Sequence, residues 1–321
     1  MTKEDLKIVF MGTPEFAVAS LKALVENNFN VVGVITMPDK PAGRGYKLQY
    51  SAVKQYALEQ NLPLLQPTNL KDEKFLEELR ALNADLQIVV AFRMLPEVVW
   101  DMPRLGTFNL HASLLPKYRG AAPINWSIIN GDKETGITTF FLTHEIDTGK
   151  IIYQEKVEIL PEDNAETLHD KLMAKGAELV VKTTDAIIND SIETIEQEKL
   201  ISNENDITPA PKIFKETCKI NLNQSAENIN NFVRGLSPYP AAWSMLHIQN
   251  AEPVSVKIFK VAIENDDLNP GKISTDNKSY LKIGTAHGTI SIQDLQLAGK
   301  KRMKISDFLN GYKLGDNCYF E

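Results

Sequence analysis

Residues 6–24 read LKIVFMGTPEFAVASLKAL, and this stretch decides the fold class. Its first six residues are apolar except for one lysine, which suits a strand that is buried on both faces. A Gly-Thr-Pro turn follows, and Pro14 stands where the first turn of a helix accepts proline. The apolar residues that follow are spaced as one helical face; they are Phe16, Ala19, Leu21 and Leu24. A buried strand followed at once by a helix predicts a βα unit of a parallel sheet.

The same alternation continues toward residue 190. Further strand-like runs lie at 30–36 (NVVGVIT), 86–92 (LQIVVAF), 106–110 (GTFNL), 136–142 and 150–158. Residues 164–188 then have the pattern of one long helix, which Asn164 can cap. This alternation predicts a Rossmann-like α/β domain, which is an open, mostly parallel sheet with helices on both faces. In such a sheet the active site lies beyond the carboxyl ends of the strands.

A polar, proline-bearing stretch divides the chain. Residues 201–212, ISNENDITPAPK, have no periodic pattern, which is typical of a linker. Several strand-like runs separated by glycine and asparagine turns follow it, and they predict a small barrel or sandwich. The length of 321 residues also suits two domains better than one. We therefore expect an α/β domain at 1–200, the linker at 201–212, and an OB-like β-barrel domain at 213–321.

The composition is that of an ordinary globular protein, with 43% hydrophobic and 24% charged residues. No apolar run approaches the roughly 18 residues of a membrane span, and no apolar signal segment precedes the first strand. Cys218 and Cys318 lie far apart, without CxxC or Cys/His spacing, which indicates free thiols in a reducing compartment. P-loop, GxGxxG and metal-ligand patterns are missing from the sequence. We expect a cytoplasmic monomer that contacts no membrane and binds no metal.

The densest polar cluster in the sequence is NLHASLLPKYRGAAP at residues 109–123. It begins at the end of a predicted strand. Side chains two apart on a strand point to the same face, so Asn109 and His111 should project together from the strand's carboxyl end. Asp147 lies in a second polar turn, HEIDTG, between two other strand-like runs.

These three residue types suit the transfer of an acyl group to an amine. When an amine attacks a formyl carbon, negative charge develops on the formyl oxygen, and an asparagine N–H and a protonated imidazole can each donate a hydrogen bond to it. A nearby carboxylate would orient the imidazole and help take the proton from the amine. A serine or cysteine nucleophile is unnecessary, because the amine attacks directly.

A plainer interpretation remains open from the residues alone. Asn-x-His at a strand end is more often a turn with a satisfied histidine, and Asp-Thr-Gly is usually only a turn. We expect the remaining histidines to be structural or to face solvent; they are His144, His169, His247 and His287.

Longer motifs resemble a known family. The run NLHASLLPKYRGAAPINWSIINGDKETGIT at 109–138, followed by DTGKI, resembles the signature of the folate-dependent formyltransferases. Within that family the whole chain resembles the members that act on methionyl-tRNA. The shorter motifs that carry this second likeness are FMGTPEFA at 10–17, PDKPAGRGYKL at 38–48, AGKKRM at 298–303 and DFLNG at 307–311.

The resemblance implies roles for individual residues. It implies that Asn109, His111 and Asp147 are catalytic, that 10-formyltetrahydrofolate is the formyl donor, and that initiator methionyl-tRNA is the acceptor for translation initiation. Four residues match the family's folate-contacting stretch: Ser113, Leu114, Leu115 and Pro116. The sequence departs from the family pattern at two positions beside the donor pocket, where Arg93 and Ala112 stand in place of glycine.

The tRNA acceptor is also favoured by where the positive charge lies. The net charge is −7, but the chain from residue 206 onward has a small excess of positive charge over an acidic first part. In the family, the loop that matches residues 37–50 enters the acceptor-stem region, and basic residues can hold phosphates there. The expected tRNA contacts are Lys40, Arg44 and Lys47 in this loop, then Lys212, Lys215, Lys300, Lys301 and Arg302.

Two other functions stay open. One is a formyltransferase that acts on a nucleotide-linked amino sugar, and the other is a catalytically silent protein that binds RNA or folate. In the motif FVRGLSPYPAAW at 232–243, Tyr239 and Trp243 are more often core or interdomain packing than a nucleic-acid surface.

Overall fold

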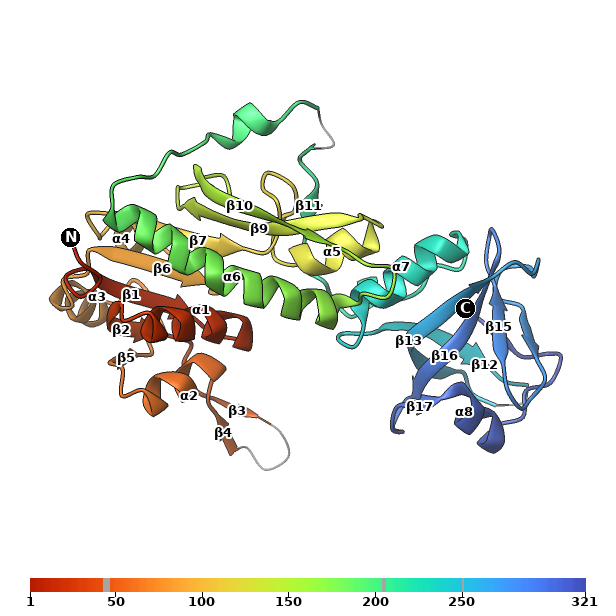
Figure 1. Ribbon diagram of the computed structural model, residues 1–321. Coiled ribbons are helices and arrows are strands. Elements are labelled where there is room, and N and C mark those ends of the chain that lie inside the picture. The colour runs from red at the N-terminus through yellow and green to blue at the C-terminus, as the bar shows by residue number, and fades with distance from the viewer. Residues whose placement is uncertain (43–46, 204–205, 250) are drawn as a thin grey trace. The chain divides into compact units, whose positions relative to one another are not determined.

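The computed structural model describes residues 1–42, 47–203, 206–249 and 251–321 (Figure 1). The chain forms two compact units, and each is described by itself. The first comprises Met1–Gly120, Thr135–Glu158 and His169–Pro209; the second comprises Ala121–Glu134, Ile159–Leu168 and Ala210–Glu321. Two short segments from within residues 1–200 thus belong to the same unit as the C-terminal part. Within the described residues, no helix is long and apolar enough to cross a membrane.

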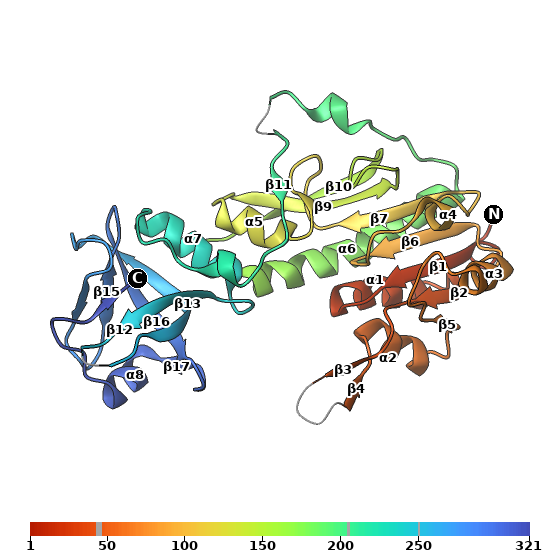
Figure 2. The same ribbon diagram turned by 180° about the vertical axis from the view of Figure 1, so that it is seen from behind.

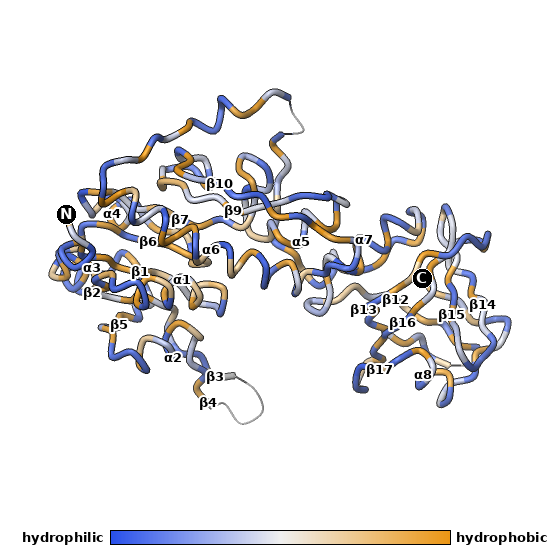
Figure 3. Tube along the Cα trace, in the orientation of Figure 1, coloured by the Kyte–Doolittle hydropathy of each residue, from blue (hydrophilic) through white to orange (hydrophobic). Residues whose placement is uncertain are grey.

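The first unit is built on a seven-stranded sheet of order β10-β9-β7-β6-β1-β2-β5. Its strands are β1 (Lys7–Gly12), β2 (Asn30–Ile35), β5 (Leu64–Leu65), β6 (Leu86–Val90), β7 (Thr107–His111), β9 (Glu134–Phe141) and β10 (Ile151–Glu158). The β1-β2, β1-β6, β2-β5 and β6-β7 pairs are parallel, whereas β7 and β9 are antiparallel. All five residues of β6 are buried, and Figure 3 shows how apolar this strand is. The predicted mostly parallel α/β class is confirmed.

Helices cover both faces of this sheet. They are α1 (Glu15–Glu26), α2 (Ala52–Glu59), α3 (Glu73–Ala81), α4 (Glu97–Trp100) and α6 (Ala165–Ile188), with the short 3-10 helix η1 (Gln197–Leu200). Figures 1 and 2 show α1 and α6 on one face, and the ring of Phe16 on α1 meets His169 on α6. On the opposite face, Phe75 of α3 and Val99 of α4 join one apolar cluster with Val89 of β6.

The face of β7 follows from its register. Asn109 pairs with Val89 on the neighbouring strand, so the two side chains lie on the same face, the one covered by α3 and α4. Leu110 points to the other face, where it packs against Gly176 of α6. Asn109 and His111 therefore emerge on the α3/α4 face, at the carboxyl end of β7.

The second unit contains an antiparallel β-barrel. Its strands are β12 (Ala242–His247), β13 (Val254–Glu264), β14 (Ile273–Thr275), β15 (Leu281–Gly284), β16 (Thr289–Leu297), β17 (Met303–Lys304) and β18 (Tyr319–Phe320). Six of them follow the order β14-β15-β16-β13-β12-β18, and a bridge between Lys272 and Tyr319 nearly closes the ring. Helices α5 (Pro123–Ile129), α7 (Ala226–Leu236) and α8 (Ile305–Gly311) and the 3-10 helix η3 (Glu216–Cys218) complete the unit. The predicted C-terminal barrel is confirmed.

Four short strands lie outside the two large sheets. The hairpin of β3 (Lys40–Ala42) and β4 (Lys47–Gln49) frames the basic loop, and β8 (Arg119–Gly120) pairs with β11 (Pro209–Ala210). The stretch 201–212, which the sequence predicts to be a linker, thus contains a strand as well as irregular chain.

Candidate active site

His111, the last residue of β7, is held by one ring nitrogen and turns the other toward a carboxylate. Nε2 lies 2.8 Å from the main-chain oxygen of Tyr118. A carbonyl oxygen only accepts, so Nε2 carries the hydrogen of this bond. Nδ1 lies 3.8 Å from Oδ2 of Asp147. The ring also meets Phe140 edge to face, with centroids 6.4 Å apart.

Asp147 is a largely buried carboxylate, with its side chain 12% exposed. Its Oδ2 accepts a hydrogen bond of 2.9 Å from the main-chain N–H of Gly120. The same oxygen therefore faces both Gly120 and the imidazole. The structure brings His111 and Asp147 together although 36 positions separate them in the sequence.

The turn that carries Asp147 has a constrained main chain. Asp147 has a φ of 56°, in the left-handed region that few non-glycine residues adopt. Two residues later, a Cβ on Gly149 would collide with the carbonyl oxygen of Phe141, so only glycine fits. The buried amide of Gln197 donates hydrogen bonds to the main-chain oxygens of Asp147 and Gly149. Nothing in the sequence marks Gln197, because a glutamine in a short irregular segment has no pattern of its own.

Asn109 supplies a polar group without an internal partner. Its Oδ1 is buried and has no hydrogen-bond partner among the described residues. A buried polar atom left unpaired normally costs free energy, and such atoms often mark a ligand site. Asn109 and His111 lie on the same face of the same strand. The arrangement therefore offers an amide, an imidazole and a carboxylate at one strand end.

The four residues expected at the folate donor are mostly turned into the protein. Ser113 and Leu115 are fully buried: the Ser113 hydroxyl donates to the main-chain oxygen of Lys117, and Leu115 packs with Phe140. Pro116 is buried too and follows a cis peptide bond. Only Leu114 is half-exposed. Side-chain contact with a bound donor is therefore open to Leu114, whereas the others can contribute mainly through their main chain.

Arg93 stands where glycine is expected, and its side chain leaves the loop. The guanidinium donates to the main-chain oxygens of Pro67 and Thr68, at 2.5 and 2.9 Å. Burial lowers the pKa of this guanidinium. Ala112, the second departure, is buried after the end of β7. Both departures are accommodated by packing within the first unit.

The predicted tRNA contacts differ in how freely their side chains project. Lys40 is exposed in β3; Arg44 lies outside the described residues, and of Lys47 only the main chain is described. Lys300 and Lys301 are exposed in the turn between β16 and β17. Arg302 instead donates two hydrogen bonds to the buried Oδ2 of Asp294.

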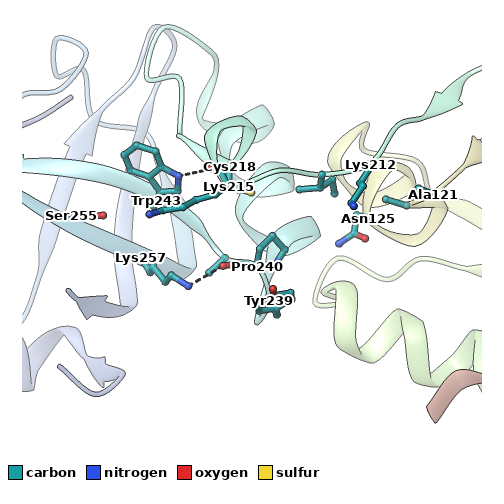
Figure 4. A pocket seen from close by; sticks show the side chains of 13 residues that line it. Ala121, Asn125, Lys212, Lys215, Cys218, Tyr239, Pro240, Trp243, Ser255 and Lys257 are labelled. Carbon is teal, nitrogen blue, oxygen red and sulfur yellow. Dashed lines mark hydrogen bonds between the residues drawn. The ribbon is translucent and has the colours of Figure 1, made fainter. Parts of the chain in front are cut away.

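The second unit has a cavity of about 470 Å³ (Figure 4). Lys212, Lys215 and Lys257 line it together with Trp243. The indole N–H of Trp243 donates to the main-chain oxygen of Lys215, and Lys257 Nζ donates to that of Pro240. The cavity is thus lined by three lysines and by an indole ring that a hydrogen bond holds in place.

Tyr239 and Trp243 have different surroundings. Tyr239 is 81% exposed, so within its own unit it is not core. Trp243 packs against the apolar core of the barrel, as the plainer interpretation expects.

The other histidines lie on the surface of elements or in loops. His144 faces Glu97, His169 faces Asp170, and His247 stacks on Tyr319, while His287 is exposed. Within the described parts of the chain, no group of three or more histidine, cysteine or acidic residues could hold a metal ion.

Comparisons with known proteins identify the family. The family description "Formyl transferase" matches residues 6–199, and "Formyl transferase, C-terminal domain" matches residues 212–313. The methionyl-tRNA formyltransferase of Bacteroides thetaiotaomicron is 62% identical over 318 residues, 98% of each chain. That of Porphyromonas gingivalis is 49% identical over the whole of both chains. The chain belongs to the methionyl-tRNA formyltransferase family.

Solved structures share the fold at lower identity. An N-formyltransferase from Helicobacter canadensis, in complex with folinic acid and dTDP-3-aminofucose, has a TM-score of 0.64 and 23% identity over 93% of this chain and all of that one. HypX from Aquifex aeolicus in complex with tetrahydrofolic acid has a TM-score of 0.63 and 17% identity, and covers 97% of this chain and 48% of that one. The formyltransferase class predicted from the sequence is confirmed by the family descriptions and the curated relatives.

Proposed function

We propose that this methionyl-tRNA formyltransferase moves the formyl group of 10-formyltetrahydrofolate to the free amino group of initiator methionyl-tRNA in the cytoplasm. The observation that carries the proposal is the pairing of His111 with Asp147, 3.8 Å apart beside the strand that also bears Asn109. These groups can stabilise the oxyanion and accept the proton of an attacking amine.

In the proposed reaction, the methionyl nitrogen attacks the formyl carbon and the carbonyl oxygen becomes an oxyanion. The amide N–H of Asn109 and the Nδ1–H of the protonated His111 imidazole donate hydrogen bonds to it, since the Nε2–H is already committed to Tyr118. Asp147 accepts the proton that the amine loses, directly or through water. When the tetrahedral intermediate collapses, the bond between carbon and N10 breaks. N10 takes the proton that Asp147 accepted, directly or through water, and leaves as tetrahydrofolate, which restores the carboxylate.

The donor is proposed to bind beside this trio, at the loop of residues 90–96 and the stretch from Ser113 to Pro116. Because Ser113, Leu115 and Pro116 are buried, we assign their contacts to main-chain groups, and a side-chain contact to Leu114 alone. This location agrees with the rule that ligands of open α/β sheets bind outside the carboxyl ends of the strands.

The acceptor is proposed to bind through local clusters of positive charge on an otherwise acidic protein. The clusters are the loop with Lys40, Arg44 and Lys47, the lysines of the cavity, and the turn with Lys300 and Lys301. Phosphate contacts of this kind position RNA without reading its sequence. Lys257, which lies on the cavity wall beside Lys212 and Lys215, joins the expected residues.

One assay decides between the proposed acceptor and a nucleotide-linked amino sugar. The protein is incubated with 10-formyltetrahydrofolate and either charged initiator tRNA or a dTDP-linked amino sugar, and the formylated product is identified by mass. Formylmethionyl-tRNA as the product supports the proposal. Formylation of the sugar alone would show that the nucleotide-linked amino sugar is the acceptor. If neither acceptor is formylated, the remaining alternative is a catalytically silent protein that binds RNA or folate.

A further inference from the structure

Gln197 is a completely buried amide whose hydrogen-bonding groups are all in use. Its Nε2 donates to the main-chain oxygens of Asp147 and Gly149, both at 2.8 Å. Its Oε1 accepts from Nε and Nη2 of Arg119, at 3.1 and 2.7 Å. A glutamine amide has two N–H donors and one oxygen with two lone pairs, so this side chain is saturated.

The three residues that Gln197 contacts belong to the catalytic region. Asp147 and Gly149 form the constrained turn, whereas Arg119 directly precedes Gly120, whose N–H binds the Asp147 carboxylate. The turn is therefore held twice: Gly120 holds the carboxylate, and Gln197 holds the main chain beneath it. Arg119 and Gln197 link these two contacts into one closed ring of hydrogen bonds.

The segment that carries Gln197 is docked against the strand that follows the turn. Ile195 exchanges two main-chain hydrogen bonds of 2.9 Å with Ile151, the first residue of β10. Lys150 forms an exposed ion pair with Glu196. The main-chain pairing of Ile195 with Ile151 therefore places Gln197 against the turn, whereas the exposed ion pair contributes little.

We propose that Gln197, braced by Arg119, is a positioning residue for formyl transfer, which fixes the Asp147 carboxylate relative to the imidazole of His111. The inference rests on the proposed function. The separation of 3.8 Å between His111 Nδ1 and Asp147 Oδ2 is just too long for a hydrogen bond. A small displacement of the turn therefore decides whether the carboxylate can reach the imidazole or the attacking amine, and a misplacement of about 1 Å can cost on the order of 100-fold in rate.

The main test replaces Gln197 by leucine, which removes all four hydrogen bonds with little change in volume. Q197L should lower kcat by about 10- to 100-fold and change KM for the folate donor by less than about 2-fold. E196Q is the matched control: it removes only an exposed ion pair on the same segment, and kcat should stay the same.

A double-mutant cycle separates positioning from general stability. If Gln197 acts through Asp147, adding Q197L to D147A should cost less than about 2-fold further, because the carboxylate to be positioned is already gone. An equal loss in both backgrounds, or a Q197L protein with near-normal kcat, would overturn the proposal.

If Q197L does not fold, R119K serves instead, because it keeps the charge but loses the double donation to Gln197. R119K should lower kcat about 5- to 10-fold in the native background and hardly at all in D147A, and the opposite pattern would overturn the proposal. Wild-type protein that is inactive with donor and tRNA would instead reject the proposed function itself.

Discussion

His111 Nδ1 and Asp147 Oδ2 lie 3.8 Å apart, with only 7% of the histidine side chain and 12% of the aspartate side chain exposed. The other imidazole nitrogen donates to the Tyr118 carbonyl, so the ring cannot turn without breaking that bond. The nitrogen that faces the carboxylate is therefore the one available to an oxyanion or to an incoming amine. In the proposed reaction, the hydrogen bond to the oxyanion and the proton transfer to Asp147 therefore both take place on the Nδ1 side of the ring.

Removal of any of the three polar groups should slow chemistry much more than binding. We expect N109A, H111A and D147A each to lower turnover at least about 100-fold, which is about 2.7 kcal/mol of barrier. Folate affinity, measured by titration, should change far less. H144A is the control, because this histidine is 72% exposed and contacts Glu97 and Trp100, away from the three polar groups. A folded H111A protein with near-normal turnover would contradict the mechanism.

Leu115 and Leu114 should respond differently to truncation. Leu115 is 1% exposed and packs with Phe140 and Ile151, so L115A should lower the free energy of unfolding by about 2–5 kcal/mol. Leu114 is half-buried, and L114A should lower the affinity for the folate donor with a smaller loss of stability than L115A. Chemical denaturation and donor titration of both variants check this. The same loss of donor affinity without destabilisation in L115A would show that its side chain contacts the donor.

Two neighbouring cations of the AGKKRM motif should separate structure from tRNA binding. Arg302 binds the buried Asp294 carboxylate and lies over the ring of Phe259, so R302A should destabilise the protein by about 1–3 kcal/mol. Lys301 is exposed, so K301A should leave stability unchanged. It should reduce the salt dependence of tRNA binding by about one phosphate contact. Thermal unfolding and binding at several salt concentrations measure both. A K301A protein with wild-type salt dependence would remove this turn from the interface.

The sequence predicted the sheet well because its signals are local. The apolar run at Lys7–Gly12 and the helical spacing of Phe16, Leu21 and Leu24 act within one βα unit, and each formed where expected. Asn109 and His111 could be placed on one face for the same reason, since strand periodicity alone decides it.

Contacts that depend on the return path of a loop could not be predicted. The chain after β9 starts beside Thr107, to whose carbonyl Leu142 donates, and then returns so that Asp147 meets His111. Nothing periodic in the turn encodes that return. Leu115 was assigned to the donor by resemblance, yet it is buried, because a motif does not state which side chains face inward. Nothing in the sequence marks Gln197 either, because its partners are main-chain oxygens and the side chain of Arg119, 78 positions away.

The carboxylate at the base of the basic loop should make stability sensitive to acid. Lys54 Nζ donates to Oδ2 of Asp39 at 2.5 Å, and Gln66 Nε2 donates to its Oδ1 at 2.9 Å. These two bonds, and chiefly the one from Lys54, lower the pKa of the Asp39 carboxyl. A lowered folded-state pKa contributes stability that is present above the unfolded pKa of about 3.9 and is lost as the pH falls through the folded pKa. D39N should therefore be less stable at neutral pH and show a flatter decline below pH 4. Denaturation curves at several pH values test this, and parallel declines of variant and wild type would contradict it.

The cavity lysines offer a test of the second unit's part in tRNA binding. Lys257 and Lys260 are both exposed on β13, but only Lys257 lines the cavity. Each phosphate neutralised by a lysine releases counterions and steepens the salt dependence of binding. K257A should therefore lower the affinity for charged tRNA and reduce the slope of its salt dependence by about one phosphate contact. K260A should change neither the affinity nor the slope.

The same measurement compares the cavity with the basic loop. Replacing Lys40, Arg44 and Lys47 together should lower the slope by up to about three contacts, and adding K257A should lower it further, because contacts made by separate clusters are independent. A protein of net charge −7 repels a polyanion except where its cations are concentrated, so the two clusters should account for most of the slope. Equal slopes for K257A and wild type would exclude the cavity from the interface, and an unchanged slope after the loop replacements would favour a small nucleotide-sugar acceptor.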